Sequence, residues 1–398
     1  MAAKPVMLVL LAFAGLHTAC TSGAQPASSA AAFDRIVLPT GQAPGSILIA
    51  DINHDGYPDL LIANTGGETL TVLLGDGHGH FHAAAGDPPR TGHSPNDLAI
   101  GDFNGDGHPD LLIANTETPN LTILLGDGKG GFQPAAHSPF VTTSQPHVHG
   151  VAVGDFNGDG KLDAVTDSWA HDHILMFFGD GAGNLITPGR IFNTGKRPYQ
   201  RLRTADFNRD GKMDVVTTDL DANAVSILLG DGHGGLTDAP GSPVPAGGAP
   251  WAVTIDDFNR DGNPDLAVVP YDRDLKDAKD LGVTVLLGDG RGGFRKLRAD
   301  PLSLAGCRGP DRIATGDING DGFPDIAVTC AQNNRLMLFF GSKDGAFRAV
   351  SQEVQTGWSG LAVGDLNGDG KADIAVSNAG EGPRSTPAGT VTVFLRMR

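Results

Sequence analysis

Carboxylates recur in this sequence at a spacing that suits a hard metal ion. The nine-residue motif Asp-x-Asn-x-Asp-Gly-x-x-Asp occurs seven times, beginning at Asp51, Asp102, Asp155, Asp206, Asp257, Asp317 and Asp365. Each copy has carboxylates at positions 1, 5 and 9 and an Asn amide at position 3. Oxygen ligands without His or Cys select Ca²⁺ or Mg²⁺ over zinc. The motif therefore predicts calcium as the cofactor, at up to seven sites.

Two further positions of the motif shape the predicted loop. Position 6 is glycine in every copy, as a sharp turn with positive φ requires. Position 7 varies too widely for its side chain to be a ligand, so we expect its backbone carbonyl to bind the ion, as in an EF-hand loop. An EF-hand itself is excluded, because position 12 carries an aliphatic residue or Thr instead of a bidentate Glu.

The predicted ligands follow from this numbering. The side-chain ligands are Asp51, Asn53, Asp55 and Asp59; Asp102, Asn104, Asp106 and Asp110; Asp155, Asn157, Asp159 and Asp163; Asp206, Asn208, Asp210 and Asp214; Asp257, Asn259, Asp261 and Asp265; Asp317, Asn319, Asp321 and Asp325; and Asp365, Asn367, Asp369 and Asp373. The carbonyl ligands belong to Tyr57, His108, Lys161, Lys212, Asn263, Phe323 and Lys371.

The charge composition agrees with bound cations. The chain of 398 residues has 46 acidic and 29 basic residues, for a net charge of −17. Three Asp in each of seven motifs account for 21 of the acids, and seven calcium ions would bring the net charge to −3. A nucleic-acid-binding protein needs a basic face, so this composition argues against that class.

The setting of the motif predicts the elements that position it. A short apolar run precedes each copy and another follows it. A third run ends in glycine in the first six copies, before a turn that carries Asp76, Asp127, Asp180, Asp231 or Asp289 in five of them. A fourth, weaker strand is expected to open with an apolar residue, usually Phe, at Phe81, Phe132, Leu185, Leu236, Phe294 and Phe347. Short apolar runs bounded by Gly, Asn and Asp are typical of strands. Four antiparallel strands in each repeat of about 50 residues predict an all-β, seven-bladed β-propeller.

The chain ends predict how the ring closes. The last repeat stops at its third strand, near residues 391–395, and residues 33–38 form a strand with no repeat before them. We therefore expect the N-terminal strand to join the last blade, which would leave no open sheet edge. Residues 33–398 are predicted to form one seven-bladed domain, and we expect it to be a monomer.

These motifs resemble the FG-GAP/VCBS repeat family, whose best-known members are the calcium-binding propeller heads of integrin α subunits. The resemblance covers nearly all of residues 33–398. It implies that the metal loops join the first and second strands of each blade. Integrins carry calcium in only some blades, whereas all seven loops look complete here. The chain is more similar to the short bacterial exported members of the family.

The N-terminus is predicted to direct export. Residues 1–19 combine Lys4 with an apolar stretch too short to span a bilayer, which is typical of a signal peptide. Cys20 follows a sequence resembling a lipoprotein cleavage site, although His17 stands where an aliphatic residue is preferred. Lipidation of Cys20 would give an outer-membrane or cell-surface lipoprotein, with the lipid as its one membrane contact. The alternative is cleavage after Ala24 and secretion. Residues 20–32 are predicted to be a Ser/Ala-rich tether.

The face opposite the metal loops is predicted to carry specificity. It is built from the segments before each first strand and the loops between second and third strands, where the repeats diverge. The candidate ligand-binding residues are Asn96, Asp97, His147, His149, Tyr199, Arg201, Trp251, Asp311, Arg312 and Trp358. Cys307 and Cys330 also reach this face, where they form either a disulfide or two free thiols. Four histidines (His147, His149, His171 and His173) offer a transition-metal site or a set of solvated side chains.

Three classes of function are compatible with this arrangement. The first is a calcium-stabilised scaffold that recognises a protein or glycan, since aromatic and Arg residues are typical of binding sites. The second is a polysaccharide lyase or hydrolase that binds its substrate in the central channel of the propeller, with His147, Tyr199 and Arg201 as catalytic candidates. The third is a structural envelope component. The sequence contains no nucleophile elbow, P-loop or dinucleotide-binding fingerprint.

Overall fold

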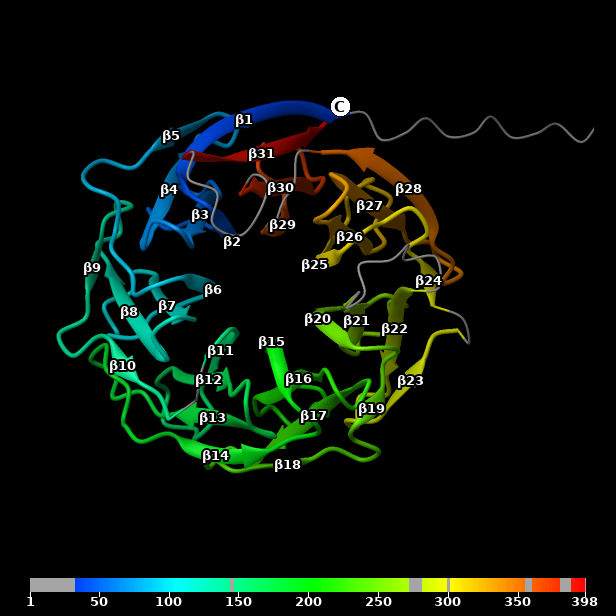
Figure 1. Cartoon of the computed structure of the whole chain (residues 1–398), viewed down its shortest axis with the longest axis horizontal. Helices are drawn as coiled ribbons and strands as arrows, with labels where there is room; N and C mark the ends of the chain where they lie inside the picture. The colour runs from blue at the N-terminus through cyan, green and yellow to red at the C-terminus, as the bar shows by residue number, and fades with distance from the viewer. Residues whose placement is uncertain are drawn as a thin grey trace, which may run out of the picture.

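The computed structural model describes residues 33–143, 147–271, 281–298, 301–354, 360–379 and 388–397. These residues form seven antiparallel sheets arranged as the blades of a closed ring (Figure 1). The predicted all-β, seven-bladed propeller is therefore confirmed. Within this described part of the chain, no helix has the length and apolar character needed to cross a membrane.

The first four blades follow one another around the ring, each running from the innermost strand outward. Blade 1 contains β2 (Pro44–Ala50), β3 (Asp59–Asn64), β4 (Thr69–Gly75) and β5 (Phe81–Ala83). Blade 2 contains β6 (Pro95–Gly101), β7 (Asp110–Asn115), β8 (Asn120–Gly126), β9 (Phe132–Pro134) and β10 (Phe140–Val141). Blade 3 contains β11 (Val151–Gly154), β12 (Asp163–Asp167), β13 (His173–Phe177) and β14 (Arg190–Asn193). Blade 4 contains β15 (Pro198–Ala205), β16 (Asp214–Asp219), β17 (Ala224–Gly230), β18 (Leu236–Asp238) and β19 (Val244–Pro245).

The last three blades complete the ring. Blade 5 contains β20 (Pro250–Asp256), β21 (Asp265–Pro270), β22 (Gly282–Gly288), β23 (Phe294–Lys296) and β24 (Leu302–Ser303). Blade 6 contains β25 (Pro310–Gly316), β26 (Asp325–Cys330), β27 (Arg335–Phe340) and β28 (Arg348–Glu353). Blade 7 contains β29 (Leu361–Gly364), β30 (Asp373–Asn378), β31 (Ala388–Arg396) and, on its outer edge, β1 (Phe33–Gln42).

The ring closes through the two ends of the chain. Strand β1 pairs antiparallel with β31, and Phe33 lies opposite Arg396 while Leu38 lies opposite Val391. In Figure 1 the blue N-terminal strand lies along the outside of the red C-terminal strand. This pairing confirms the predicted closure, and the edge that β31 would otherwise expose is covered.

In blade 3 the fourth strand begins later than the sequence predicted. Leu185 makes an isolated bridge to Gly179, and the strand β14 begins later, at Arg190. Pro188 lies between them and has no backbone N–H to donate to a strand ladder. The expectation of a continuous fourth strand beginning at Leu185 was therefore wrong for this blade.

The hydrophobic core lies between neighbouring blades. One cluster joins Leu112 and Ile123 of blade 2 to Val151 and Leu175 of blade 3, and all four side chains are buried. Second strands such as β3, β7 and β16 are buried at every residue, which explains their continuous apolar runs. This packing fixes the inner strands, whose ends carry the two candidate sites.

Candidate functional site

The repeated motif forms the loop between the first and second strands of every blade. In blade 1 this loop joins β2 to β3, and its side chains accept hydrogen bonds from its own backbone. Asp51 accepts from the N–H groups of Asp55 (3.2 Å) and Gly56 (2.9 Å). Asp55 accepts from Tyr57 N–H (2.9 Å) and from the Asn53 amide (2.9 Å). Gly56 has a φ of +88°, which explains the glycine at position 6.

The Asp at motif position 9 also has a structural role. Its Asp is the first residue of every second strand and is 0% exposed in all seven blades. Asp59 accepts hydrogen bonds from Ile52 N–H (2.9 Å) and Gly75 N–H (2.8 Å), so it ties the loop to the end of the third strand. Blades 2 to 5 repeat this pattern; Asn319 and Arg396 supply one N–H each in blades 6 and 7.

The same contact explains a glycine in the sequence pattern. Gly75 and its counterparts in blades 2 to 6 lie at or just after the end of the third strand, where a Cβ atom would collide with the carbonyl oxygen of motif position 8, such as that of Pro58. The close approach, together with the hydrogen bond to Asp59, makes glycine the residue that fits. This role of position 9 was not anticipated from the sequence.

The oxygen atoms of the loops are chemically suited to bind a calcium ion. Positions 1, 3 and 5 present carboxylate and amide oxygens at half-buried to exposed sites, and position 7 adds a carbonyl. Position 9 is engaged by backbone N–H groups, but a carboxylate offers about four lone-pair sites and can accept these bonds and bind an ion. In the described part of the chain, no three Asp, Glu, His or Cys side chains converge into a metal-binding group.

Burial dominates the ionisation of the ninth-position carboxyls. Desolvation raises the pKa of Asp163, Asp214 and Asp373 to about 6 and the pKa of Asp265 and Asp325 to about 7. The backbone N–H bonds oppose this rise, whereas the other two Asp of each loop add to it through repulsion. A divalent cation in the loop would favour the ionised carboxylates.

Contacts on this face also link one blade to the next. The N–H groups of Gly183, Gly234 and Gly292 donate to the position 2 carbonyls of the preceding blade, at 2.9, 2.8 and 3.2 Å. Position 4 of one loop contacts position 7 of the next: the rings of His54 and His108 lie 5.5 Å apart. On this face, which carries the predicted metal loops and which we call the metal-loop face, these contacts link blades 1 to 5 in order. The Asp residues of the glycine-rich turns on this face stabilise the turns themselves, since Asp127 accepts hydrogen bonds from the N–H groups of Lys129 and Gly131.

The opposite face carries a chain of aromatic rings from blades 3, 4 and 5. We call His147, His149, Trp169, Tyr199, Trp251 and Tyr271 the aromatic arc. Ring centroids lie 5.7 Å apart for His147 and Trp169, 6.2 Å for Trp169 and Tyr199, and 4.8 Å for Tyr199 and Trp251. Trp251 stacks on Tyr271 at 4.2 Å. Three of its residues, His149, Tyr199 and Trp251, line the entrance to the central channel of the ring, which we call the mouth.

A cavity of about 210 Å³ occupies this mouth. It is lined by six of the ten predicted ligand-binding residues: Asn96, His149, Tyr199, Trp251, Asp311 and Arg312. Two buried carboxylates hold the rings in place. Asp311 accepts from the Trp251 indole N–H (2.9 Å), and Asp167 accepts from His149 N–H (2.7 Å) and lies 3.2 Å from the His149 Nδ1.

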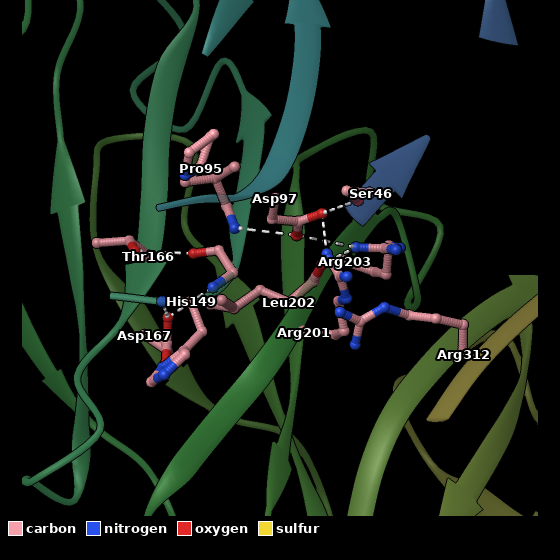
Figure 2. Close-up of polar contacts among 12 residues, drawn as sticks. Ser46, Pro95, Asp97, His149, Thr166, Asp167, Arg201, Leu202, Arg203 and Arg312 are labelled. Atoms are coloured by element: carbon pink, nitrogen blue, oxygen red, sulfur yellow. Dashed lines mark hydrogen bonds and ion pairs between the residues drawn. The ribbon is translucent and has the colours of Figure 1, made fainter. Parts of the chain in front are cut away.

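Behind the mouth, a second cavity of about 320 Å³ lies among the innermost strands. Figure 2 shows Asp97 there, beside Arg201 and Arg203. Arg312 also lines this cavity, and its Nη1 lies 3.2 Å from Asp311 Oδ1 in an ion pair. Asp97 and Arg201 are 3% exposed and form an ion pair; Asp97 also accepts from Ser46 Oγ (3.2 Å) and Val151 N–H (3.3 Å). Burial and the neighbouring cations Arg312 and Arg203 lower the pKa of Arg201.

The structure therefore brings together nine of the ten predicted rim residues, while Trp358 lies outside the described residues. Of the catalytic candidates, His147 lies against Thr116 O at 2.9 Å, and Arg201 faces Asp97. The histidine that contacts Tyr199 is His149, with ring centroids 4.5 Å apart. Cys307 and Cys330 are joined by a disulfide. Cys20 and residues 1–32 lie outside the described residues.

Several residues of this face were missed by sequence reasoning. Arg203 follows Tyr199 and Arg201 at strand spacing, which places Arg201 and Arg203 on one side of β15 and is a readable signal. Trp169 and Tyr271 each come shortly after a second strand, where loops reach this face. The four histidines form two pairs: the ring centroids of His147 and His149 lie 5.7 Å apart, and those of His171 and His173 lie 4.9 Å apart. In the described ranges, no three Asp, Glu, His or Cys side chains are grouped so that they could hold a metal ion.

Comparisons with known proteins agree with this geometry. The profile of the FG-GAP-like repeat family matches residues 51–113, 102–166, 206–268 and 317–376. Cartilage acidic protein 1 from Homo sapiens is 27% identical over 186 residues, which cover 42% of this chain and 27% of that protein. Integrin alpha-PS5 from Drosophila melanogaster is 33% identical over 108 residues, covering 26% of this chain and 11% of that protein. The aligned region thus spans about a quarter or less of these relatives.

Solved structures show the same fold. A catalytically inactive variant of virginiamycin B lyase from Staphylococcus aureus, crystallised with quinupristin, aligns with a TM-score of 0.56 at 14% identity. The alignment covers 92% of this chain and all of that one. At this identity the likeness concerns the arrangement of blades alone.

Proposed function

Because the chain belongs to the FG-GAP-like repeat family, we propose that it is an exported, calcium-stabilised β-propeller that binds a protein or glycan at its channel mouth. The family resemblance, the oxygen-rich loops and the charge composition support the calcium part of this proposal. The N-terminal sequence supports export, with a lipid anchor at Cys20 or release after cleavage. The proposed division places stability on one face and recognition on the other.

The aromatic arc is the observation that carries the recognition part. Large aromatic side chains with a nearby Arg are characteristic of binding hot spots. Here they border a cavity on the face where the repeats diverge, and Asp167 and Asp311 hold His149 and Trp251 in fixed orientations. A ligand would therefore meet an ordered surface, which lowers the entropic cost of binding.

The test compares the two faces with one residue type. Tyr199→Ala removes a half-buried ring from the mouth, and Tyr57→Ala removes a 42% exposed ring from the metal-loop face. The full chain and both variants are applied to an immobilised glycan panel and to biotinylated cell-surface proteins. We expect Tyr199→Ala to weaken binding at least tenfold and Tyr57→Ala to leave it unchanged. Loss of binding with Tyr57→Ala alone would place recognition on the metal-loop face and contradict the proposal.

A further inference from the structure

The channel behind the mouth has an excess of positive charge. Its lining includes three guanidinium groups, from Arg201, Arg203 and Arg312, and one carboxylate, from Asp97. Asp311, at the mouth, adds a second carboxylate. The chain as a whole has a net charge of −17, so this positively charged cavity contrasts with the acidic composition of the protein. Buried charges in proteins are normally paired, so the excess points to an anion.

The hydrogen bonds around Asp97 show which cations are placed to meet that anion. Asp97 pairs with Arg201 and is also engaged by Ser46 and Val151. Arg203 Nη1 lies further from Asp97, at 3.9 Å, and the Arg203 side chain is 38% exposed. Arg312 lines both cavities and pairs with Asp311 at 3.2 Å, so the three guanidinium groups face two carboxylates and one positive charge remains in excess.

The electrostatics of Arg203 and Arg312 agree with this arrangement. Burial and the proximity of Arg312 lower the pKa of Arg203 to about 10. Two guanidinium groups that repel each other in a confined space gain from an anion placed between them. Guanidinium groups bind carboxylates through two parallel N–H donors, which suits a planar carboxylate better than a point cation would.

We propose that the channel takes the carboxylate of an acidic sugar, held by Arg203 and Arg312, while the sugar ring lies at the mouth against Tyr199 and Trp251. This inference rests on the proposed function and specifies its ligand. The cavities, of about 210 and 320 Å³, together reach the size of small-molecule pockets, about 300–1,000 Å³.

The mouth favours a sugar over an acidic peptide. Its lining combines aromatic rings with small polar side chains, including Thr65, Ser94, Asn96 and Thr116. Aromatic rings pack against the apolar faces of sugars, and hydroxyl and amide groups pair with their hydroxyls. An acidic peptide would fill the Arg centre equally well but would make less use of these polar groups.

The test uses pairs of sugars that differ only in charge. The full chain is titrated by calorimetry, at fixed ionic strength, with uronic-acid oligosaccharides and with the same oligosaccharides after methyl esterification, which removes the charge. An immobilised panel with neutral, sialylated, uronate and sulfated glycans extends the comparison. We expect the acidic form to bind at least tenfold more tightly than its ester.

Three variants locate the effect. Arg312→Gln and Arg203→Gln should weaken acidic-sugar binding at least tenfold, and Arg203→Lys should weaken it less. The matched control is Arg35→Gln on the exposed outer strand β1, which should leave binding unchanged. Circular dichroism verifies that each variant is folded; because Arg203 is partly exposed, its substitution is the less disruptive of the two.

The possible failures are distinguishable. Equal binding of acid and ester, or full binding by both Gln variants, would overturn the carboxylate site; loss with Tyr199→Ala would still support the mouth as the recognition surface. Binding restricted to sulfated glycans, or to none of the glycans, would also overturn the inference. Binding of cell-surface proteins that Tyr199→Ala does not affect would instead refute the proposed function.

Discussion

The two faces of the propeller are the two ends of the same seven hairpins, but they differ in how strictly residues repeat. On the metal-loop face, the nine-residue motif recurs in every blade, and its ninth Asp is buried each time. On the opposite face, the aromatic arc comes from blades 3, 4 and 5, and the Arg residues come from blades 4 and 6. Repetition therefore marks the demands of the scaffold, and departure from repetition marks the candidate recognition surface.

The comparison also separates two uses of aspartate. Asp265 and its equivalents hold backbone N–H groups and close each blade, so the fold needs them whether or not an ion is bound. Asp97 and Asp311 contact side chains that occur once, such as Arg201 and Trp251. A carboxylate on the first face is predicted to matter for stability, and one on the second for the shape and charge of the mouth.

The largest effect is expected from Asp265→Ala. This change leaves the N–H groups of Phe258 and Gly288 without their acceptor in a buried position. We expect a loss of about 3–5 kcal/mol in the free energy of unfolding, since each orphaned group costs about 1–3 kcal/mol. Urea unfolding in EDTA measures it, with Asp261→Ala at exposed position 5 as the control. An equal loss in both variants would remove the distinction between positions 5 and 9.

The next effect concerns the disulfide, which lies on the opposite face. Cys307 and Cys330 are separated by 23 residues and enclose the metal loop of blade 6. Closing a loop of this size stabilises a protein by about 3 kcal/mol in the chain-entropy view. The double variant Cys307→Ala/Cys330→Ala should lose about this much in urea unfolding, while its response to calcium stays unchanged. A loss of the calcium response would show that the two faces are coupled through this hairpin.

The sequence predicted the repeated face more fully than the other. The motif spacing indicated seven blades, because it depends on a local pattern that recurs. The chain ends indicated closure through residues 33–38, and the family resemblance implied that the motif loops join the first and second strands. The nine predicted rim residues that the structure describes also come together, since topology alone decides which loops share a face. The charge centre was not predicted, because Asp97, Arg203 and Arg312 come from blades 2, 4 and 6 and meet only when the ring closes.

The stability of the protein is expected to depend on pH through Asp219, which lies at the end of β16 on the face opposite the metal loops. Burial raises the pKa of Asp219 to about 7, although a hydrogen bond from Ser226 (2.6 Å) opposes the rise. The folded state therefore holds a proton that the unfolded state releases near pH 4, and stability falls as the pH rises from about 4 to 7. Compared with Asp219→Asn, the wild type should lose about 1 kcal/mol per pH unit between pH 5 and 7.

Urea unfolding at pH 5, 6 and 7 measures this difference. Ser226→Ala provides the matched variant, because removing the donor should raise the pKa of Asp219 further and extend the loss to higher pH. Parallel pH profiles for the wild type and Asp219→Asn would show that Asp219 is ionised in the folded state at all three values.

The smallest effect is expected from Arg203→Gln in the ligand-free protein. Removing one of three neighbouring cations relieves repulsion, so we expect the melting temperature to rise by about 2–4 °C, which corresponds to about 1 kcal/mol. Differential scanning calorimetry without sugar measures it, with Arg35→Gln as the control. A fall in the melting temperature would mean that Arg203 stabilises the channel without an anion, which would contradict the proposed anion site.

The measurement that tests the division of the two faces most directly is the thermal unfolding midpoint of the wild-type chain in calcium and in EDTA. Saturation to 100 times Kd stabilises a protein by about 2.7 kcal/mol per site, and several sites act together. The account predicts a midpoint more than about 10 °C lower in EDTA, restored by added calcium. An unchanged midpoint would contradict it, because the repeated Asp loops would then not be calcium-dependent stability elements.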